Sequence, residues 1–388
     1  MNFKFKLNIY DIIFFILINI FLIFYSFSAT SSETIAKYAL LIDADTDYVM
    51  LEKNSNQLMY PASMSKLMTS YIVFDRLKSK TISLDDTFRV SEKAWKKGGS
   101  KMFVEVGSRV TVEDLLRGMI VQSGNDASIV LAEGLSGSEE MFALEMNRYA
   151  KKMGLNGSNF KNSTGWPDPE HITTANDLGI LAKRLFKDFP FYMKYYSEKT
   201  FTYNNISQGN RNPLLYKNLG ADGLKTGHTE KSGYGLVAST KRGNRRLILV
   251  INGLESSKQR SIEAERLLDW GYREFDNYSI FKKNQIIKEL PVWLGQKNKL
   301  PIQIKNDIKL TMTRPQFNKL EASIIYNKPI HAPINSGQQV AILKIKVPNE
   351  SEKIIPLLSN QKVSKINFFG RIKEQLLFLL YGHLTNEK

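Results

Sequence analysis

A long apolar segment behind Pro61 is the strongest feature of the hydrophobic pattern. From Met64 to Phe74, apolar residues would occupy nearly every face of a helix, whereas a surface helix has a single apolar stripe. We therefore expect a helix that begins near Ser63 and lies buried in the middle of a domain. Amphipathic stretches predict further helices, opened at Thr111 and at Thr173 or Thr174, over residues 112–120, 127–133, 138–153, 174–186 and 261–275.

Strand-like runs occur on both sides of these helices. Residues 38–43 and 48–51 predict a hairpin around a turn at 44–47, and later runs predict strands at 223–226, 234–241 and 246–252. Strands at both ends of a helical region indicate a sheet in which the first and last strands are neighbours, with helices on its faces. The predicted fold class is therefore α/β in the broad sense (α+β).

The pattern changes after the last of these helices. Residues 281–356 contain short alternating runs, for example at 300–304, 308–312 and 339–347, and no motif that carries chemistry. We expect a small all-β domain at residues 278–360, which serves for spacing or for contact with a partner. The larger domain before it is assigned to residues 29–277.

An interrupted apolar run lies near the end of the sequence. Nine apolar residues between Ile366 and Leu380 are broken up by Lys365, Arg371 and Lys373. The run is too charged to cross a bilayer but is suited to lie in its surface. We assign residues 361–388 to an amphipathic membrane-anchor helix, and a helix packed on the β domain is the alternative.

Residues 1–28 have the pattern of a signal peptide. Lys4 and Lys6 precede an apolar run at 12–24, and Ser26 and Ser28 are the small residues expected before a cleavage site. Cleavage after Ser28 is predicted. Because the site is not a regular Ala-x-Ala, an uncleaved N-terminal anchor is the alternative. Both interpretations place the folded part outside the cytoplasm.

The composition gives the protein a positive net charge and excludes chemistry that depends on cysteine. The 388 residues have a formal net charge of +16 and no cysteine, which excludes disulfides and thiol catalysis. A basic protein is attracted to nucleic acid, anionic lipid or cell-wall polymer. The lysines are spread widely and no nucleic-acid motif is present, so a solvated basic surface is the simpler interpretation. The four histidines, at 171, 228, 331 and 383, lack the spacing of a metal site, and we expect neither metal nor cofactor.

Ser63 and Lys66 form a Ser-x-x-Lys pattern at the start of the buried helix. Residues three apart are neighbours on a helix, so the hydroxyl and the amine can meet. A neutral lysine amine can take the proton of a serine hydroxyl that attacks a carbonyl, and burial and the helix dipole both lower the lysine pKa. The same pattern occurs at Ser158, Ser279 and Ser359, but no apolar helix follows there.

Two further motifs follow Ser-x-x-Lys in the chain. Ser123-Gly124-Asn125 is the only Ser-x-Asn, expected as a turn between helices, and Lys225-Thr226-Gly227 is the only Lys-Thr-Gly, expected on a strand edge. An extended peptide can align beside such an edge. Three motifs in this order, each with a chemical role, are a specific signal.

The residues around the motifs make the chain resemble the serine-type D-alanyl-D-alanine carboxypeptidases of the low-molecular-mass penicillin-binding-protein group. The resemblance rests on residues 60–69, 123–127 and 222–229, and it covers about Ala36 to Phe275. It implies a β-lactamase/transpeptidase-like domain with an antiparallel sheet and helices on both faces. It also implies an enzyme that removes the terminal D-alanine from peptidoglycan stem peptides and that β-lactams acylate.

The resemblance implies a catalytic set of three residues. Ser63 is the nucleophile and Lys66 its base. Ser123 is a hydroxyl relay between Lys66, the leaving amine and Lys225. The backbone N–H groups of Ser63 and His228 would form the oxyanion hole.

The implied substrate-binding residues are Asn125, Lys225, Thr226, Gly227 and His228. Asn125 would hold Lys66 and a substrate amide, while Lys225 and Thr226 would bind the terminal carboxylate. Repulsion from Lys225 would also keep Lys66 neutral, and Gly227 would leave room for the substrate backbone.

Three other side chains are weaker candidates. Arg211 and Arg260 are candidates to help hold the carboxylate, although surface salt bridges are the usual role of arginine. The side chain of His228 invites a role as a general base, but a lone histidine next to a lysine is more often structural.

Three other functions compete with the carboxypeptidase. A class A β-lactamase has the same motifs but needs a glutamate that activates water, and Glu170 lacks the usual Glu-x-x-Leu-Asn setting. A D,D-endopeptidase that cuts peptidoglycan cross-links uses identical chemistry, and a non-catalytic wall-binding module would not need the motifs. We expect a peripheral protein on the periplasmic face of the bacterial inner membrane, with stem peptides and β-lactams as partners and no nucleic acid.

Overall fold

The computed structural model describes residues 33–381, and the account below is confined to them. The predicted signal peptide lies outside this range. We divide the described chain into an N-terminal domain, a β domain that begins at β10, and a final helix, α11. Each is described by itself.

The predicted helices and strands of the N-terminal domain occur in the predicted order with shifted ends, and short elements that we did not predict lie between them. They are β1 (Tyr38–Asp43), β2 (Val49–Lys53), η1 (Ala62–Ser65), α2 (Lys66–Lys78), β3 (Thr87–Arg89), α3 (Glu92–Lys96), β4 (Arg109–Thr111), α4 (Val112–Val121), α5 (Asn125–Ser136), α6 (Glu139–Met153), α7 (Ala175–Asp188), η2 (Pro190–Met193), α8 (Lys194–Ser197), β5 (Thr200–Tyr203), β6 (Ile206–Gly209), η3 (Pro213–Tyr216), β7 (Ala221–Thr229), β8 (Gly233–Arg242), β9 (Arg245–Leu254) and α9 (Ser257–Glu274).

In this part of the chain the main sheet is antiparallel and has five strands in the order β2-β1-β9-β8-β7. The first and last strands of the sequence pattern are neighbours, because β1 pairs with β9 with Leu40 opposite Val250. This confirms the predicted sheet. The order also leaves β7 at an edge, so one side of its backbone is not paired within the sheet.

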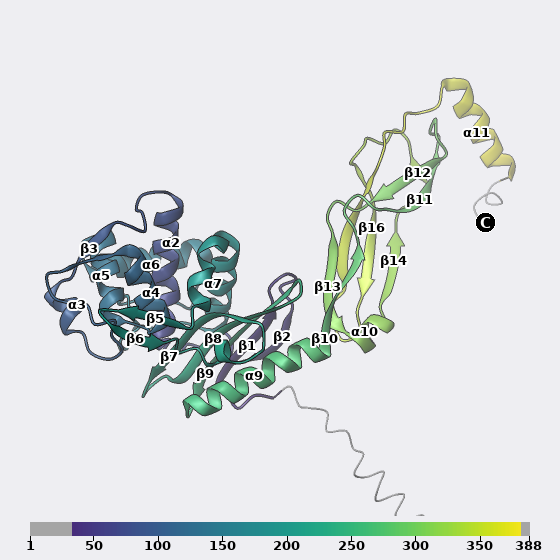
Figure 1. The fold of residues 1–388 in the computed structure, drawn as a ribbon. Coiled ribbons are helices and arrows are strands. Elements are labelled where there is room, and N and C mark those ends of the chain that lie inside the picture. The colour runs from purple at the N-terminus through teal and green to yellow at the C-terminus, as the bar shows by residue number, and fades with distance from the viewer. Residues whose placement is uncertain (1–32, 382–388) are drawn as a thin grey trace, which may run out of the picture. The chain divides into compact units, whose positions relative to one another are not determined.

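The sheet separates two apolar cores, which follow from the alternation of side chains along each strand. Leu40 and Ile42 of β1 face a core built with α2, whereas Ala39 and Leu41 face a core built with α9. Figure 1 shows α9 along one face of the sheet and the other long helices on the opposite face. Helices therefore cover both faces, as predicted.

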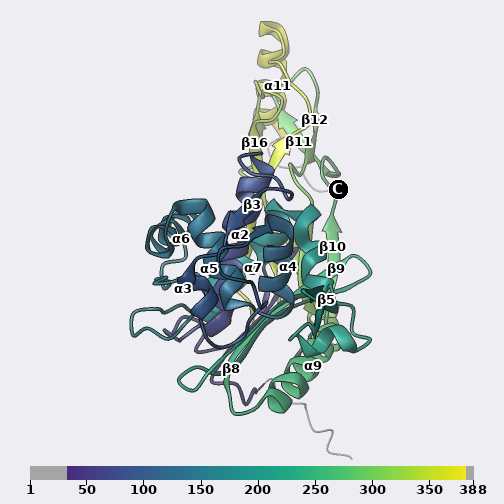
Figure 2. The same cartoon turned by 60° about the vertical axis from the view of Figure 1, so that its left-hand side comes forward.

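The predicted buried helix is α2, which lies among α4, α5, α6 and α7 (Figure 2). Every residue of α2 from Lys66 to Phe74 is buried. The predicted caps are present as well, since Thr111 Oγ1 accepts from Asp114 N–H at 3.1 Å and Thr174 Oγ1 from Asp177 N–H at 3.0 Å. Thr174, rather than Thr173, is the cap of α7.

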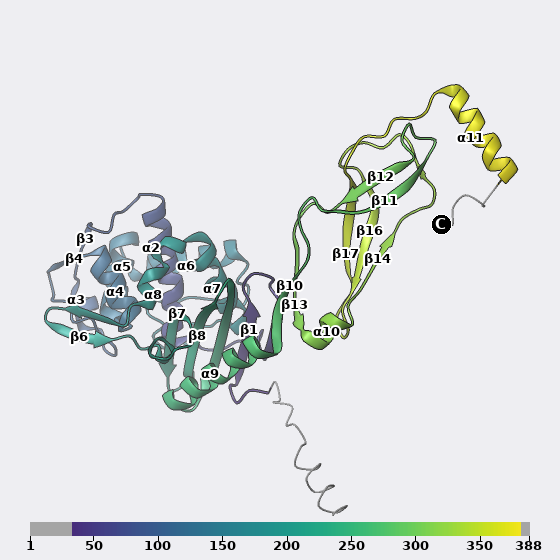
Figure 3. The same cartoon turned by 45° about the vertical axis from the view of Figure 1, so that its right-hand side comes forward.

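The β domain confirms the expected small all-β unit. Its elements are β10 (Phe275–Phe281), β11 (Ile286–Trp293), β12 (Lys299–Gln303), β13 (Ile308–Thr313), α10 (Arg314–Asn318), β14 (Glu321–Ile325), β15 (Ile330–His331), β16 (Gln339–Lys346) and β17 (Lys353–Ser359). In the described chain, β14, β16 and β17 run side by side in a sheet of six strands (Figure 3). Val363 is buried in the core of this domain and Ile366 N–H donates to Leu294 O at 3.0 Å.

The final helix, α11 (Phe368–Tyr381), begins seven residues after the boundary that we predicted at residue 361. The intervening residues belong with the β domain, because Val363 fills part of its core. The exposed apolar side chains of α11 repeat at helical spacing, at Phe368, Ile372, Leu376 and Leu379. Between residues 33 and 381 no helix is both long enough and apolar enough to cross a membrane.

Candidate active site

Ser63 lies in a tight turn in front of the buried helix. We predicted that Ser63 and Lys66 share one helix, but Ser63 belongs to the 3₁₀ turn η1 and α2 begins at Lys66. Residues three apart are eclipsed in a 3₁₀ turn, so the two side chains still meet. Ala62, immediately before Ser63, has a φ of 46°, a left-handed value that costs free energy in a residue with a Cβ and recurs at functional sites.

Lys66 Nζ has three polar neighbours. It lies 3.0 Å from Ser63 Oγ, 2.7 Å from Asn125 Oδ1 and 2.7 Å from Thr164 O. A neutral amine has two N–H donors and one lone pair, whereas an ammonium has three donors. The two carbonyl oxygens can only accept, and the Ser63 hydroxyl can donate. The arrangement therefore suits a neutral amine whose lone pair faces the hydroxyl of Ser63.

Burial favours that neutral form. Only 1% of Lys66 is exposed, and burial lowers the pKa of its amine to about 7. The nearby carboxylates of Asp126 and Glu139 raise this pKa and oppose burial, while Lys97 lowers it further. The resemblance had assigned that repulsion to Lys225. In the structure, burial is the largest cause of the low pKa of Lys66, and the cation that lowers this pKa further is Lys97.

Ser123 and Asn125 stand on the predicted turn between α4 and α5. Ser123 has a φ of 65°, so its backbone is in the left-handed region as well. Asn125 Nδ2 donates to Gly98 O at 2.9 Å while its Oδ1 accepts from Lys66, which fixes the orientation of the amide. Ser123 contacts Lys225, and a direct hydrogen bond from Ser123 to Lys66 is absent among the described residues.

Lys225 and Thr226 lie on the edge strand β7, as predicted. Lys225 Nζ donates to Ser123 Oγ at 2.9 Å and to Thr226 O at 3.2 Å. Burial holds the pKa of Lys225 well below its ordinary value, and the charges of Lys66, Arg260 and Arg211 lower it further. Lys225 and the two arginines thus bring positive charge to one small region beside the neutral amine of Lys66. Such a region attracts an anion.

The two arginines differ in their surroundings. Arg260, near the start of α9, is buried, and among the described residues its Nε has no hydrogen-bond partner. Arg211 is exposed, and its backbone N–H donates to Val121 O at 3.2 Å, close to the Ser123 turn. A buried guanidinium N–H without a partner is costly, which makes Arg260 the better of the two candidates for binding a carboxylate.

Gly227 and His228 continue β7 beyond Thr226. A Cβ on Gly227 would lie 2.7 Å from Pro61 O, so the nucleophile turn, rather than a substrate backbone, requires glycine here. The exposed ring of His228 stacks on Tyr234 with 3.9 Å between ring centroids. The stacking on Tyr234 therefore favours a structural role for the His228 side chain over a role as a general base.

A loop at residues 162–171 holds the nucleophile turn, and our sequence reasoning gave it no role. Gly165 packs so closely on Ala62 that a Cβ would lie 1.8 Å from Ala62 O. His171 is buried, and its Nε2 lies 2.8 Å from the hydroxyl of Ser65. The same loop supplies Thr164 O to Lys66. Its contacts are made by the backbone oxygens of Ser163 and Thr164, so no residue type in the sequence identified this loop.

Asp126 is the other residue that we missed. Its buried carboxylate accepts from Met102 N–H at 2.8 Å and from Phe103 N–H at 2.8 Å, which ties the loop before α4 to the Ser123 turn. By contrast, the side chain of Glu170, the candidate base of a β-lactamase, is 71% exposed and forms an ion pair of 3.0 Å with Lys161. The exposure and the ion pair indicate that Glu170 is a surface residue rather than a base that activates water.

The fold and the site are those of a serine hydrolase, with the amine of Lys66 3.0 Å from the hydroxyl of Ser63. Comparison with known proteins refines this class. The family model for D-alanyl-D-alanine carboxypeptidase matches residues 26–256, and that for the C-terminal domain of penicillin-binding protein 5 matches residues 275–365.

Individual relatives agree with the family models. The chain is 38% identical to the D-alanyl-D-alanine carboxypeptidase DacC of Escherichia coli over 87% of this chain and 86% of the relative. It is 35% identical to DacA of Haemophilus influenzae over 92% of each chain. The crystal structure of penicillin-binding protein 5 from H. influenzae has 35% identity and a TM-score of 0.76, over 86% of this chain and 98% of the other.

The chain therefore belongs to the D-alanyl-D-alanine carboxypeptidase family. This confirms the family, the fold class and the serine carboxypeptidase activity that the sequence predicted. The roles of the individual site residues and the exact domain limits stay predictions, which the next section develops.

Proposed function

We propose that this protein removes the terminal D-alanine from peptides that end in D-Ala-D-Ala through an acyl-enzyme on Ser63. The observation that carries the assignment is the set of contacts at Lys66 Nζ, where two carbonyl oxygens take its N–H groups and the Ser63 hydroxyl lies 3.0 Å away. The names of the relatives supply the substrate class.

Acylation begins when neutral Lys66 takes the proton of Ser63 Oγ as that oxygen attacks the carbonyl carbon of the scissile amide. The backbone N–H groups of Ser63 and His228 stabilise the negative oxygen of the tetrahedral intermediate. The C–N bond then breaks, and the leaving D-alanine amine takes, through Ser123, the proton that Lys66 had accepted, so Lys66 is neutral again. Ser123 is positioned to pass that proton, because its hydroxyl accepts from Lys225 at 2.9 Å.

Deacylation repeats the same steps with water as the nucleophile. Lys66 takes a proton from the water that attacks the ester carbonyl, and Ser63 Oγ leaves and is protonated again. No separate base is needed. This fits the surface position of Glu170, and it sets the protein apart from a class A β-lactamase.

The peptide binds as an extended strand beside the free edge of β7. Its terminal carboxylate lies against Lys225 and Thr226, with Arg260 supplying a buried, unpaired N–H and Arg211 a more exposed charge. Asn125 holds Lys66 and one amide of the substrate. A β-lactam presents a carbonyl and a carboxylate in a similar arrangement, so it acylates the same serine.

The assignment is tested by intact-mass measurement after incubation with benzylpenicillin, followed by peptide mapping and an assay of D-alanine release. We expect one adduct, on the peptide that contains Ser63, and D-alanine release that the antibiotic abolishes. An adduct on Ser158, Ser279 or Ser359, or none, would contradict the assignment.

Replacing Lys225 by methionine should lower kcat/KM for a D-Ala-D-Ala peptide about 10²-fold, because an ionic hydrogen bond to the terminal carboxylate is lost. Methionine keeps the length of the buried side chain. The assay should include a peptide that ends in D-alanine amide, which lacks the carboxylate.

The variant should lose much less activity on this amide than on the acid. An equal loss on both would show that Lys225 acts only through Ser123. Lys241→Met, which removes an exposed lysine at the far end of β8, is the control and should retain wild-type values on both peptides.

We also propose that α11 holds the enzyme on the outer face of the inner membrane, with the N-terminal segment directing export. The exposed apolar residues of α11 repeat at helical spacing, and Lys373 lies among them. A helix of this kind lies in the plane of the interface. We place the boundary between the β domain and this anchor at residue 367, because Val363 is part of the β-domain core.

Deleting residues 368–388 from the mature protein should release it from membranes without changing its activity on a short soluble peptide. Sedimentation with inner-membrane vesicles measures the first effect and kcat/KM the second. If the truncated protein still sediments, the N-terminal segment is an uncleaved anchor. If it loses activity, α11 is part of the fold.

A further inference from the structure

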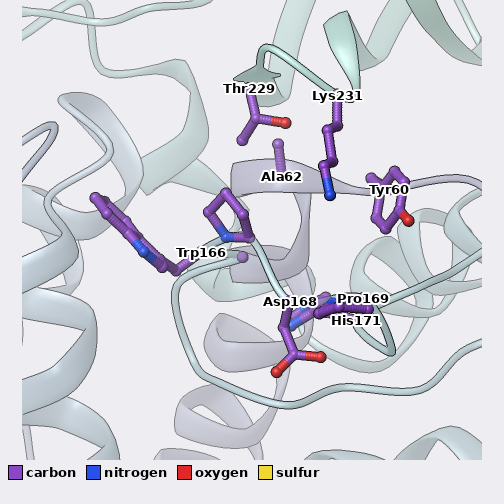
Figure 4. Close-up of a pocket in the computed structure, with 10 residues that line it drawn as sticks. Tyr60, Ala62, Trp166, Asp168, Pro169, His171, Thr229 and Lys231 are labelled. Atoms are coloured by element: carbon purple, nitrogen blue, oxygen red, sulfur yellow. The ribbon is translucent and has the colours of Figure 1, made fainter.

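Lysines lie in two different settings in this protein. Lys231 lines the hollow beside the nucleophile turn and belongs to the active site of the N-terminal domain (Figure 4). Another group of lysines lies in the β domain, which takes no part in the proposed mechanism. Four of them gather at the end of that domain from which the chain continues to α11.

Three segments that are distant in the sequence form this end of the β domain. Trp293 pairs with His331 where β11 meets β15, and Gln296 N–H donates to Ser364 O at 2.8 Å. Figure 3 shows β11 and β12 towards this end of the domain and α10 at the opposite end. We call the surface of the three segments the basic rim; they are residues 293–298, 326–333 and 361–367.

The basic rim carries positive charge only. It contains four lysines and neither aspartate nor glutamate, and the four are Lys297, Lys328, Lys362 and Lys365. All four are exposed, and within residues 33–381 none of them forms an ion pair. Glu289, the acid nearest to the rim along the chain, pairs instead with Lys299 at 3.7 Å. The charge of the rim is therefore not neutralised within the described part of the chain.

Aromatic side chains accompany these lysines. The half-buried ring of Trp293 meets the exposed ring of His331 edge to face, with 4.9 Å between the ring centroids. Lys328 Nζ lies 5.6 Å from the ring centre of the half-buried Tyr326. Tryptophan and tyrosine are enriched where a membrane meets water, because each combines an apolar ring with a polar group. The composition of the rim thus fits a surface that meets lipid headgroups.

The rim is tethered to α11. Ile366 N–H donates to Leu294 O at 3.0 Å, so the backbone is held at the rim two residues before the helix begins at Phe368. Two residues of extended chain span at most about 7 Å. The field of a charged surface extends about 10 Å at 0.1 M salt. When α11 lies in the membrane interface, the adjoining part of the rim is therefore within reach of charged headgroups.

We propose that the basic rim is a second membrane-binding element, which recognises anionic lipid headgroups and supplements the apolar contact of α11. The proposal rests on the proposed anchoring by α11, because that helix brings the rim to the surface. A lysine near an anionic membrane increases partitioning about fivefold, and this effect falls as the salt concentration rises.

The rim by itself is too weak to hold the protein, because stable attachment requires a second signal such as a buried apolar face. The release that we expect on deletion of residues 368–388 is consistent with this. The rim instead sets which membranes the full-length protein prefers.

The test measures how the mature full-length protein partitions onto sedimented vesicles of phosphatidylcholine alone or with roughly one-third phosphatidylglycerol, which is anionic. The rim variant combines Lys297→Gln, Lys328→Gln, Lys362→Gln and Lys365→Gln. The matched control replaces by glutamine four exposed lysines of the β domain outside the rim, which are Lys305, Lys319, Lys346 and Lys353. Both variants lose the same net charge, so a difference between them reports the position of the lysines.

At low salt the wild type should favour the anionic vesicles at least about tenfold over the neutral ones. The rim variant should lose about tenfold or more of its partition coefficient on anionic vesicles and none on neutral ones, whereas the control should lose less than about threefold. At roughly 0.5 M salt the wild type and the rim variant should differ by less than about twofold, because the charges are screened.

The possible results are distinguishable. A rim variant that binds anionic vesicles like the wild type, or a control that loses as much as the rim variant, overturns the rim, while binding of the wild type to neutral vesicles upholds anchoring by α11. Absence of wild-type binding to either kind of vesicle overturns both proposals. Unchanged release of D-alanine from a soluble peptide shows that the rim variant is folded, because the rim takes no part in catalysis.

Discussion

Replacing Ser63 by alanine is expected to abolish both the release of D-alanine and the covalent labelling by benzylpenicillin. The variant cannot form the acyl-enzyme, and loss of a nucleophile of this kind lowers turnover by about 10⁴-fold or more. Alanine fits the 3₁₀ turn, since only the hydroxyl is removed and Lys66 keeps its two carbonyl partners. The thermal unfolding temperature should therefore stay close to that of the wild type.

The matched control is Ser279→Ala. Ser279 begins another Ser-x-x-Lys run but lies exposed on β10. This control should retain full activity and labelling. If Ser63→Ala were still labelled at a wild-type rate, another residue would have to be the nucleophile, and the contacts at Lys66 would need a different explanation.

The meeting of Ser63 with Lys66 and of Ser123 with Lys225 was predictable, because each of these side chains belongs to a short motif with a distinctive setting. The apolar run after Ser63 separated this Ser-x-x-Lys from the other three, since burial of the helix lowers the pKa of Lys66. The sheet was predictable for a similar reason: alternation along β1 and β9 marks two buried faces, and a strand buried on both faces must lie inside a sheet.

What holds those side chains in place was not predictable from local pattern. Thr164 offers its backbone oxygen to Lys66 from 98 residues away, and His171 contacts Ser65 across 106 residues. A backbone oxygen has no residue type that identifies it in a sequence. Val363 is a related case, because it follows a short polar stretch and only its burial shows that it packs in the core of the β domain.

Lys66 should control the pH dependence of acylation. Burial lowers the pKa of this amine to about 7, and the base is the neutral form, so kcat/KM should rise with pH through about 7 and fall tenfold per unit below it. Lys225 should have the opposite effect on kcat/KM, because its protonated form is the active one. Its ammonium binds the carboxylate and its pKa is also lowered, so loss of its proton at higher pH should bring the rate down again. The expected profile is bell-shaped.

Lys225→Met separates the two sides of this profile. The fall at high pH should disappear and the rise near 7 should remain. The rise should move upwards only slightly, since burial is the main cause of the low pKa of Lys66 and the cation that lowers it further is Lys97. A large upward movement would show that repulsion, as the family resemblance implied, is the stronger cause.

Replacing Lys66 itself by methionine should lower the rate of acylation by ~10³–10⁴-fold, because the only base within reach of Ser63 Oγ in the described structure is removed while the length of the side chain is kept. The residual rate should no longer rise near pH 7. Stopped-flow labelling with a chromogenic cephalosporin between pH 5 and 10 measures both effects, and Lys78→Met, at the exposed end of the same helix, is the control. A residual rate that still rises through pH 7 would mean that another group with a similar pKa activates Ser63. The buried His171, whose pKa is lowered to about 4 and whose Nε2 contacts Ser65, does not titrate in that range.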